Sequence, residues 1–242
     1  MSRDLNELLG STLAGRFELR TVLGQGGYGA VFEAEQISMG RRCAVKVLAP
    51  RDGVDRKNTA RFEMEARATS KLSHPNTITI FDFGEDVEAG VFFIAMEFVE
   101  GQDLSTMLKS GPLSVSEVLH ILAQAAQSLD DAHSHGIIHR DVKPQNIMIC
   151  PRSGDALYLK VIDFGIAKAL GKADLKPNTA LTITGTIVGT PQYMSPEQVR
   201  DTALDGRSDQ YSLAVCAYTM LCGRPPFLGT SPIDIATKHL TD

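Results

Sequence analysis

The chain contains 242 residues, of which 43% are apolar, and its 24 basic and 29 acidic residues give a formal net charge of -5. This balance excludes a protein that binds nucleic acid through a broadly basic face. The longest unbroken apolar run, Val91 to Met96, is too short to cross a membrane, and the N-terminal residues lack the apolar core of a secretory signal. We therefore expect a globular, cytoplasmic protein with no inserted membrane segment.

The cysteines and histidines favour neither a disulfide framework nor a metal site. No two of the four cysteines stand at metal-ligand spacing, so we expect reduced thiols. The tightest histidine group consists of His133, His135 and His139. The first two fall at a predicted helix end and the third in a motif described below, so a metal role is the less favoured alternative.

Short β-like runs alternate with turn signals in the first part of the chain. Val, Ile and Phe are concentrated in five runs, which predict strands at 17–23, 30–35, 43–48, 77–83 and 91–98.

One helix, from about Asn58 to Leu72, interrupts these strands. Its inward residues recur at steps of three and four and therefore share one helix face: Phe62, Glu65, Ala66, Thr69 and Leu72. The carboxylate of Glu65 is thus predicted to turn toward the protein, where an acid usually has a cationic partner.

Beyond Gly101 the pattern changes from strands to helices. Ser114 and Glu117 form a capping box, and the apolar stripe behind it predicts a long helix: Val115, Val118, Leu119, Leu122, Ala125, Ala126 and Leu129. A second helix, 208–222, is apolar almost all round and stops at Gly223, so we expect a buried core helix with a glycine cap. These elements predict an α+β protein with an extension at 1–12, a mostly β lobe at 13–99 and a mostly helical lobe at 100–242.

Gly24, Gly26 and Gly29 fit the pattern G-x-G-x-x-G, which two kinds of nucleotide-binding fold use. In the dinucleotide-binding kind the third glycine opens a helix, whereas residues 30–35 have a strand-like composition here. A glycine loop between two strands fits better, because it lets backbone N–H groups approach phosphates closely. An ordinary hairpin turn is the alternative.

Lys46 lies in the third predicted strand, within Ala44-Val45-Lys46. A lysine among apolar strand residues is costly to bury unless an anion meets it, and Glu65 is the available acid. Taken singly, Lys46 also fits an exposed strand lysine, because most lysines are solvated.

The segment 139–146 reads His-Arg-Asp-Val-Lys-Pro-Gln-Asn and resembles the catalytic loop of the eukaryotic-type Ser/Thr protein kinases. Asp163-Phe164-Gly165 is similar to that family's metal-binding triplet, and Ser195-Pro196-Glu197 stands where Ala-Pro-Glu closes its activation segment. The resemblance runs from about Leu13 to Asp242 and looks closest to the bacterial members. It implies a bilobal kinase-like fold with a small antiparallel β lobe, one helix in that lobe, and a mostly helical second lobe.

The resemblance also implies ATP and Mg²⁺ as cofactors and a role for each matching position. Phosphate and metal binding would fall to Gly24, Gly26, Gly29, Lys46 paired with Glu65, Asn146 and Asp163. Asp141 would accept or orient the proton of the substrate hydroxyl, while Lys143 would neutralise the transferring phosphate and Thr190 would support both. Adenine would contact Leu23, Val31, Ala44, Met148, the gatekeeper Met96 and the hinge backbone from Glu97 to Val99. Plain core packing is the alternative for each of these apolar residues.

The segment between Asp163 and Glu197 is polar and rich in threonine, so we expect it to be the site of regulation. We expect autophosphorylation at Thr182 and Thr184, with Arg140 as the partner of the added phosphate. The alternative is that threonines are simply common in loops.

The match departs from the family at the C-terminal end of the chain. The family's helical lobe continues past the position of Asp242, and in relatives the acid that matches Glu197 pairs with an arginine from that further portion. We therefore expect the chain to be a fragment of a longer protein, weakly active or inactive by itself and prone to aggregation.

Substrates implied by the resemblance are proteins rather than nucleic acids. Homodimers through the small lobe and a membrane tether after the kinase domain both occur in the family. The sequence of this chain decides neither. Two other functions compete: a pseudokinase or nucleotide-binding scaffold without turnover, and a small-molecule phosphotransferase. The first usually lacks at least one of the residues Lys46, Glu65, Asp141, Asn146 and Asp163, and the second is not expected to carry Asp-Phe-Gly or a segment bounded by Ser-Pro-Glu.

Overall fold

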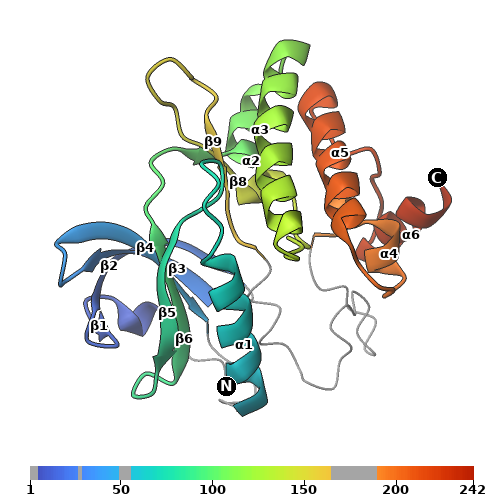
Figure 1. Ribbon diagram of the computed structural model, residues 1–242. Helices are drawn as coiled ribbons and strands as arrows, with labels where there is room; N and C mark the ends of the chain where they lie inside the picture. Colours follow the sequence, from blue (N-terminus) through green and yellow to red (C-terminus); the bar gives the residue numbers. More distant parts are fainter. Residues whose placement is uncertain (1–4, 27–28, 49–55, 165–189) are drawn as a thin grey trace. The chain divides into compact units, whose positions relative to one another are not determined.

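A computed structural model describes residues 5–26, 29–48, 56–164 and 190–242, which fold into two compact units (Figure 1). The described part of the first unit comprises residues up to 73 and 78–99, and that of the second comprises 74–77, 100–164 and 190–242. The four residues 74–77 thus belong to the second unit although both of their flanks belong to the first. Within the described residues, none of the helices combines the length and the apolar composition that a membrane span requires.

The first unit is built on a six-stranded sheet in the order β1-β2-β3-β4-β6-β5, with every neighbouring pair antiparallel. Its elements are η1 (Leu5–Leu8), β1 (Thr12–Leu13), β2 (Phe17–Gly26), β3 (Gly29–Gln36), β4 (Arg41–Leu48), α1 (Arg56–Thr69), β5 (Ile80–Asp86) and β6 (Val91–Glu97). The antiparallel β lobe with one helix is therefore confirmed. The predicted strand at 77–83 begins too early, because Thr77 is held in the second unit by the Ser128 hydroxyl at 2.7 Å.

Strand alternation divides the apolar side chains of this sheet between two cores. Phe32, Val45 and Phe93 face one core, which also takes in Leu5 and Leu8 of η1. On the opposite face Leu48, Phe92 and Ile94 pack against Phe62 and Ala66 of α1. The predicted inward face of the helix is confirmed.

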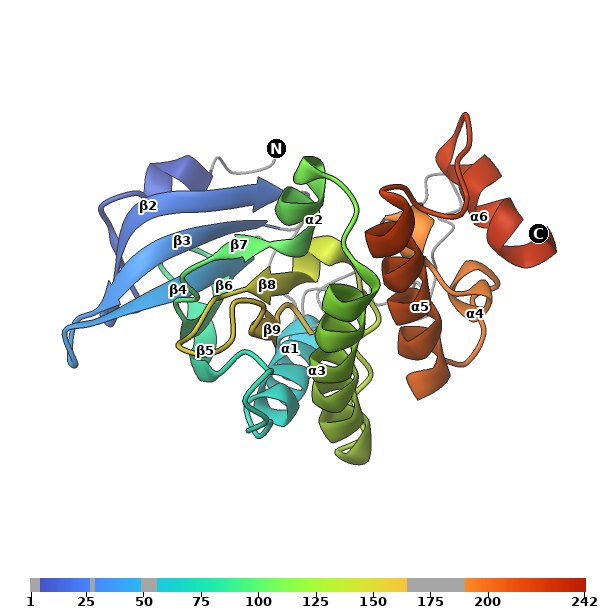
Figure 2. The same cartoon turned by 90° about the horizontal axis from the view of Figure 1, so that it is seen from above.

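The second unit combines helices with a small sheet in the order β7-β8-β9. Its elements are β7 (Gln102–Asp103), α2 (Leu104–Met107), η2 (Leu108–Ser110), α3 (Val115–Ser134), η3 (Pro144–Asn146), β8 (Ile147–Ile149), β9 (Leu159–Val161), η5 (Pro191–Tyr193), α4 (Pro196–Val199), α5 (Gly206–Cys222) and α6 (Pro232–Thr241). The two long helices, α3 and α5, pack side by side (Figure 2).

The ends of these helices follow the sequence signals, whereas their apolar faces do so only in part. The capping box is confirmed, because the Glu117 N–H donates to Ser114 Oγ and Ser114 N donates to Glu117 Oε2. Gly223 caps α5 with a left-handed φ of 70°. The expected stripe of α3 is wrong at Val115, Leu119 and Ala126, which are exposed, since the buried face follows Val118, Ile121, Ala125, Ser128, Leu129 and Ala132.

Full burial of α5 is also a wrong expectation. Tyr218 is 39% exposed and Leu221 is 43% exposed on one side of the helix. Leu213, Cys216 and Met220 are buried on the other side. The helix therefore lies at the surface of the second unit, with one side buried and the other exposed.

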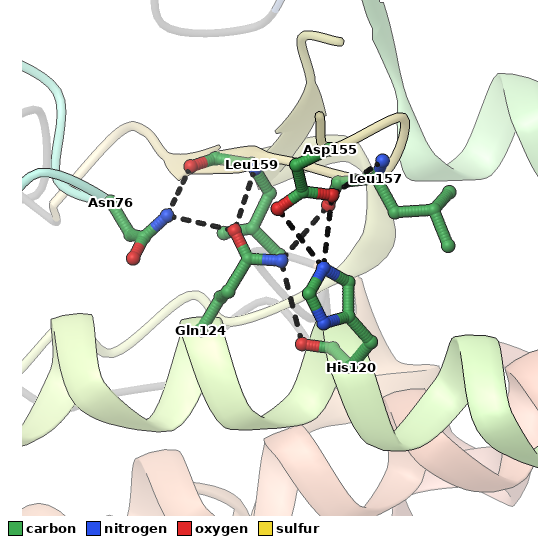
Figure 3. A network of polar contacts seen from close by, with 6 residues as sticks. All are labelled: Asn76, His120, Gln124, Asp155, Leu157 and Leu159. Atoms are coloured by element: carbon green, nitrogen blue, oxygen red, sulfur yellow. Dashed lines mark hydrogen bonds and ion pairs between the residues drawn. The ribbon is translucent and has the colours of Figure 1, made fainter. Parts of the chain in front are cut away.

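Gln124 of α3 ties the crossing segment 74–77 to the small sheet (Figure 3). Its Oε1 accepts hydrogen bonds from Asn76 Nδ2 at 3.0 Å and from the Leu159 N–H at 3.1 Å. Its Nε2 donates to the Leu157 carbonyl at 3.0 Å, and Asn76 Nδ2 also donates to the Leu159 carbonyl at 2.8 Å. One carboxamide of α3 thus satisfies polar groups from two other segments of the chain, 74–77 and 157–159.

Replacing Gln124 by Ala should destabilise the second unit, because the substitution leaves the buried Leu159 N–H and the Leu157 carbonyl without partners. We expect a loss of roughly 2–4 kcal/mol in the free energy of unfolding, measured by urea denaturation. The matched control is Gln127→Ala, at an exposed position of the same helix. Equal stability of the two variants would contradict the role given to Gln124.

Candidate active site

The glycine motif forms the tip of the β2–β3 hairpin, with Gly24 opposite Val31 and Gly26 opposite Gly29. A strand and not a helix follows Gly29, so the expectation of a loop between two strands is confirmed and the dinucleotide-binding alternative is excluded. At Gly29, which has a φ of +156°, a Cβ atom would stand 2.0 Å from the Val47 carbonyl oxygen.

Gly24 and Gly26 have no such internal reason to be glycine. A Cβ atom at either position would meet nothing within 4 Å, and neither residue has a left-handed φ. Of the three motif glycines, Gly29 is the one whose own backbone requires the absence of a side chain. Glycine at the other two positions suits close approach by a group from outside the chain, as a phosphate would require.

Lys46 and Glu65 lie on facing surfaces of the first unit. Strand alternation puts Lys46 on the same side of β4 as Leu48, which packs against Phe62 of α1. Glu65 follows Phe62 by three residues and precedes the buried Ala66, so it shares the packed face of that helix. Both side chains are half-buried, and their ion pair stays a prediction.

The apolar residues expected around adenine are distributed over both units. Val31 lies opposite Lys46, and Ala44 lies opposite Met96 in the sheet of the first unit. Leu23 is exposed. The adenine contacts stay predictions.

The expected hinge and floor of that site have well-defined local structure. Glu97 is fixed twice by Thr79: its N–H donates to the Thr79 carbonyl at 2.9 Å, and its Oε1 accepts from the Thr79 N–H at 2.7 Å. This pairing holds the start of the segment Glu97 to Val99. Met148 lies on β8 of the second unit, opposite Asp103 and Lys160.

The catalytic loop of the second unit is held around a buried histidine. His139 has no exposed surface, and its Nδ1 accepts from the Asp141 N–H at 3.2 Å. Its proton is therefore on Nε2, which donates to the Ile162 carbonyl at 2.9 Å, and its ring packs on Phe164 at 4.6 Å. His139 thus contacts both sequence neighbours of Asp163.

Asp141 is oriented by two donors that converge on one oxygen. Its Oδ2 receives Asn146 Nδ2 at 3.0 Å and lies 2.8 Å from Lys143 Nζ. Lys143 Nζ also donates to Thr190 Oγ1 at 3.4 Å. The structure thus brings together four of the predicted residues: the candidate base, the cation beside it, the amide that holds it and the supporting threonine.

Asn146 and Asp163 are placed close together by the register of β8 and β9. Ile147 pairs with Val161, and the Ile162 N–H donates to the Asn146 carbonyl at 2.9 Å, so Asp163 follows the residue opposite Asn146. Because Asn146 Nδ2 is used on Asp141, its Oδ1 is the atom left to coordinate a metal. An amide oxygen and a carboxylate fit Mg²⁺, which takes few protein ligands besides phosphates and water.

Asp209 organises this loop and was not among the residues expected from the sequence. It is 1% exposed at the start of α5. Its Oδ1 accepts from the Arg140 N–H at 2.8 Å, and its Oδ2 accepts from the His139 N–H and from His133 Nε2, both at 2.8 Å. The sequence signal was an acid in a helix expected to be buried, which demands partners.

The environment of Asp209 keeps it ionised. Burial by itself raises the pKa of this carboxyl, but hydrogen bonds from His133, His139 and Arg140 outweigh burial and hold the pKa below its usual value of 3.8. Arg140 is further fixed by Gln198 Nε2, which donates to its carbonyl at 2.8 Å. These two anchors hold Arg140 at a φ of +64°, which is strained for a residue with a side chain.

Two of the four predicted regulatory residues, Arg140 and Thr190, are among the residues that the structure describes. Thr190 is half-buried and precedes η5, and Arg140 has the fixed backbone just described. Thr182, Thr184 and Gly165 lie outside the described residues, so phosphorylation of the first two stays a prediction.

Comparison with known proteins assigns the chain to a family. Residues 17–242 match the protein kinase domain family. The chain is 45% identical over 240 residues to serine/threonine-protein kinase pkn3 of Myxococcus xanthus and 41% identical over 233 residues to serine/threonine-protein kinase PknB of Mycobacterium leprae. These matches cover 99% and 95% of this chain but only 43% and 36% of the two relatives.

Comparison with solved structures also finds protein kinase domains. The crystal structure of the Mycobacterium tuberculosis PknI kinase domain matches with a TM-score of 0.71 at 30% identity, covering 96% of this chain and 81% of that one. The chain therefore belongs to the protein kinase domain family, and its similarity is to the bacterial Ser/Thr protein kinases. The predicted family and the bilobal α+β fold are confirmed. ATP and a divalent metal are the cofactors that this family uses in general.

Two glycine substitutions should separate folding from nucleotide binding. Gly29→Ala should lower the free energy of unfolding by roughly 2–4 kcal/mol, because its Cβ would collide with the Val47 carbonyl. Gly26→Ala should leave stability within about 0.5 kcal/mol and instead raise the KM for ATP. Urea denaturation and initial-rate kinetics measure the two effects, and the reverse pattern would refute this division of roles.

Replacing Asp209 by Asn should cost roughly 2–4 kcal/mol of stability at pH 7, because a charged acceptor of several hydrogen bonds is lost. The folded-state pKa of Asp209 is depressed, so its stabilisation is fully present above pH 3.8 and is lost as the pH falls through the lower folded-state value. The gap between the parent and Asp209→Asn should therefore narrow in urea denaturations below pH 3.8. A gap independent of pH would show that the carboxylate charge is not what stabilises the loop.

Proposed function

We propose that this chain transfers the γ-phosphoryl group of ATP to serine and threonine hydroxyls of proteins. The observation that carries the proposal is the arrangement around Asp141, where Lys143 Nζ lies 2.8 Å from Oδ2 and also donates to Thr190 Oγ1. A carboxylate and an ammonium at this spacing can serve one reacting hydroxyl, one as base and the other as counter-charge. Membership of the protein kinase domain family supports the same reading.

The proposed mechanism depends on alignment more than on covalent chemistry. Asp141, held by Asn146 and Lys143, would accept the proton of the substrate hydroxyl as its oxygen bonds to phosphorus. Lys143 would offset the negative charge that develops on the transferring group, with Thr190 keeping its ammonium in place. Positioned general-base help of this kind is worth about 10² to 10⁴ in rate.

Binding of the nucleotide would fall to both units. Gly24, Gly26 and Gly29 would let backbone N–H groups approach the phosphates, and Lys46 would hold the α- and β-phosphates while paired with Glu65. Asn146 Oδ1 and the Asp163 carboxylate would hold Mg²⁺. The metal, when bound, would supply positive charge that offsets the charge of the phosphates.

Regulation by autophosphorylation of Thr182 and Thr184 belongs to the same proposal. A phosphothreonine adds a charge of about -1.5 to -2, which the Arg140 guanidinium could meet. Mass spectrometry of the protein after incubation with ATP tests this step. Unmodified peptides from an active enzyme would exclude it.

The deciding experiment measures transfer of radiolabelled phosphate from ATP and Mg²⁺ to a general protein substrate. Labelling by the parent, which we expect to be weak in this chain by itself, should fall on serine and threonine, and Asp141→Asn, which keeps the size of the side chain, should lower the rate by at least about 10². Gln145→Ala, at an exposed position of the same loop, is the matched control and should retain activity.

Each competing function predicts a different result. A nucleotide-binding scaffold would bind ATP without labelling any substrate in either variant. A small-molecule phosphotransferase would consume ATP only when a small acceptor is added. Equal labelling by the parent and Asp141→Asn would refute the role of Asp141.

A further inference from the structure

A glutamine in α4 bonds to backbone groups of two different segments. Gln198 is half-buried. Its Oε1 accepts from the Ser195 N–H at 2.9 Å, and its Nε2 donates to the Arg140 carbonyl at 2.8 Å. A backbone N–H needs an acceptor and a carbonyl needs a donor, so these partners assign the oxygen and the nitrogen of the carboxamide.

The bond to Ser195 belongs to the cap of α4. The Gln198 N–H donates to Ser195 Oγ at 3.3 Å, which completes a capping box with Gln198 as the third helical residue. The capping box of α3 has the same form, with Glu117 in the place of the glutamine. Glu117 accepts from the Ser114 N–H at 2.8 Å. Either residue type can therefore make the cap, which gives no reason for glutamine at position 198.

The bond to Arg140 supplies that reason. A carbonyl oxygen accepts but does not donate, so the group that meets it must carry a donor. Glutamine carries a donor in its NH2 group, whereas an ionised glutamate has none and would place an oxygen against the carbonyl. Glutamine is thus the capping residue that can serve the cap of α4 through its oxygen and the catalytic loop through its nitrogen.

The Arg140 carbonyl belongs to the peptide group that leads into Asp141. The N–H of this peptide group donates to His139 Nδ1 at 3.2 Å, and its carbonyl accepts from Gln198. Because a peptide group is planar, contacts at its two ends fix the orientation of the whole plane. The preceding N–H group, that of Arg140, donates to Asp209 Oδ1 at 2.8 Å. Three side chains therefore hold the backbone that enters Asp141.

The same glutamine also contacts the segment that carries Thr190. Thr190 precedes the short helix η5, and Ser195, which bonds to Gln198, lies beyond the other end of that helix. The Thr190 hydroxyl accepts from Lys143 Nζ of the catalytic loop at 3.4 Å. Gln198 therefore links the same two segments that meet at the Lys143 ammonium, the catalytic loop and residues 190–195.

We propose that Gln198 is a positioning residue for Asp141. By holding the peptide group between Arg140 and Asp141, it fixes the direction in which the Asp141 carboxylate meets a substrate hydroxyl. The inference rests on the proposed kinase activity. Gln198 acts through the backbone of the catalytic loop, so its loss should slow the transfer step and leave the binding of ATP unaffected.

The test exchanges the residue types of the two capping boxes. Gln198→Glu keeps an acceptor for the Ser195 N–H but loses the donor to Arg140. We expect its kcat to fall by roughly tenfold with an unchanged KM for ATP. The matched control is Glu117→Gln, the reverse change in α3, where the side chain bonds to the N–H and the hydroxyl of Ser114. This control should keep the kcat of the parent.

A second variant, Gln198→Met, keeps the inference testable if the glutamate variant does not fold. Methionine is unbranched and uncharged and carries no donor. We expect the same roughly tenfold loss of kcat, together with lower stability in urea because the cap at Ser195 is weakened too. Parent-like kcat in either folded variant would overturn the inference, and so would a loss of activity confined to the KM for ATP.

Hydrogen exchange of the Asp141 amide, followed by NMR, gives a readout that does not depend on turnover. After correction for global stability, exchange should be faster in Gln198→Glu and Gln198→Met than in the parent, and unchanged in Glu117→Gln. Equal exchange in all four proteins would contradict the positioning role. A parent without transferase activity would refute the proposed function, while the exchange data would still decide whether Gln198 fixes the peptide group before Asp141.

Discussion

The buried carboxylate of Asp209 is the constraint on which the candidate site depends. It accepts hydrogen bonds from two successive backbone N–H groups, those of His139 and Arg140, and so fixes the chain immediately before Asp141. Burial of an acid is unfavourable unless such donors meet it, and the same donors keep it ionised. The hydrogen bonds that Asp209 accepts therefore also hold the strained backbone at Arg140, the residue that directly precedes Asp141.

Polar residues in the second unit repeatedly bond to two segments at once. Asn146 orients the Asp141 carboxylate through its side-chain Nδ2, while its backbone carbonyl accepts from the Ile162 N–H next to Asp163. Gln124 joins α3 to the small sheet and to the crossing segment 74–77. A side chain that satisfies two partners couples their positions, because neither can move without leaving a buried group unpaired. Precise placement of a reacting group needs such coupling, since a shift of about 1 Å is enough to slow a reaction by about 10².

Much of the fold follows from local patterns. The strands of the first unit, the inward face of α1, the capping box at Ser114 and the cap at Gly223 are local consequences of alternation, helical spacing and backbone freedom. The errors arise where a distant partner decides burial. Val115 and Leu119 look like core residues by spacing yet are exposed, and Thr77 has strand-like neighbours yet bonds to Ser128. The local sequence pattern does not show which distant residues will cover a side chain or bond to it.

The sequence by itself determined the family, the residue types of the site and their order. The motif at 139–146 and the triplet that begins at Asp163 are continuous stretches of sequence, so they can be recognised without knowledge of the fold. Tertiary structure alone decided that Asp209 and His133 support the loop, and that Gly29, unlike Gly24 and Gly26, is required to be glycine by its own backbone. These facts depend on which groups meet across many residues, and the free energy of a buried polar group or a steric clash is set by its neighbours in space rather than by its neighbours in the chain.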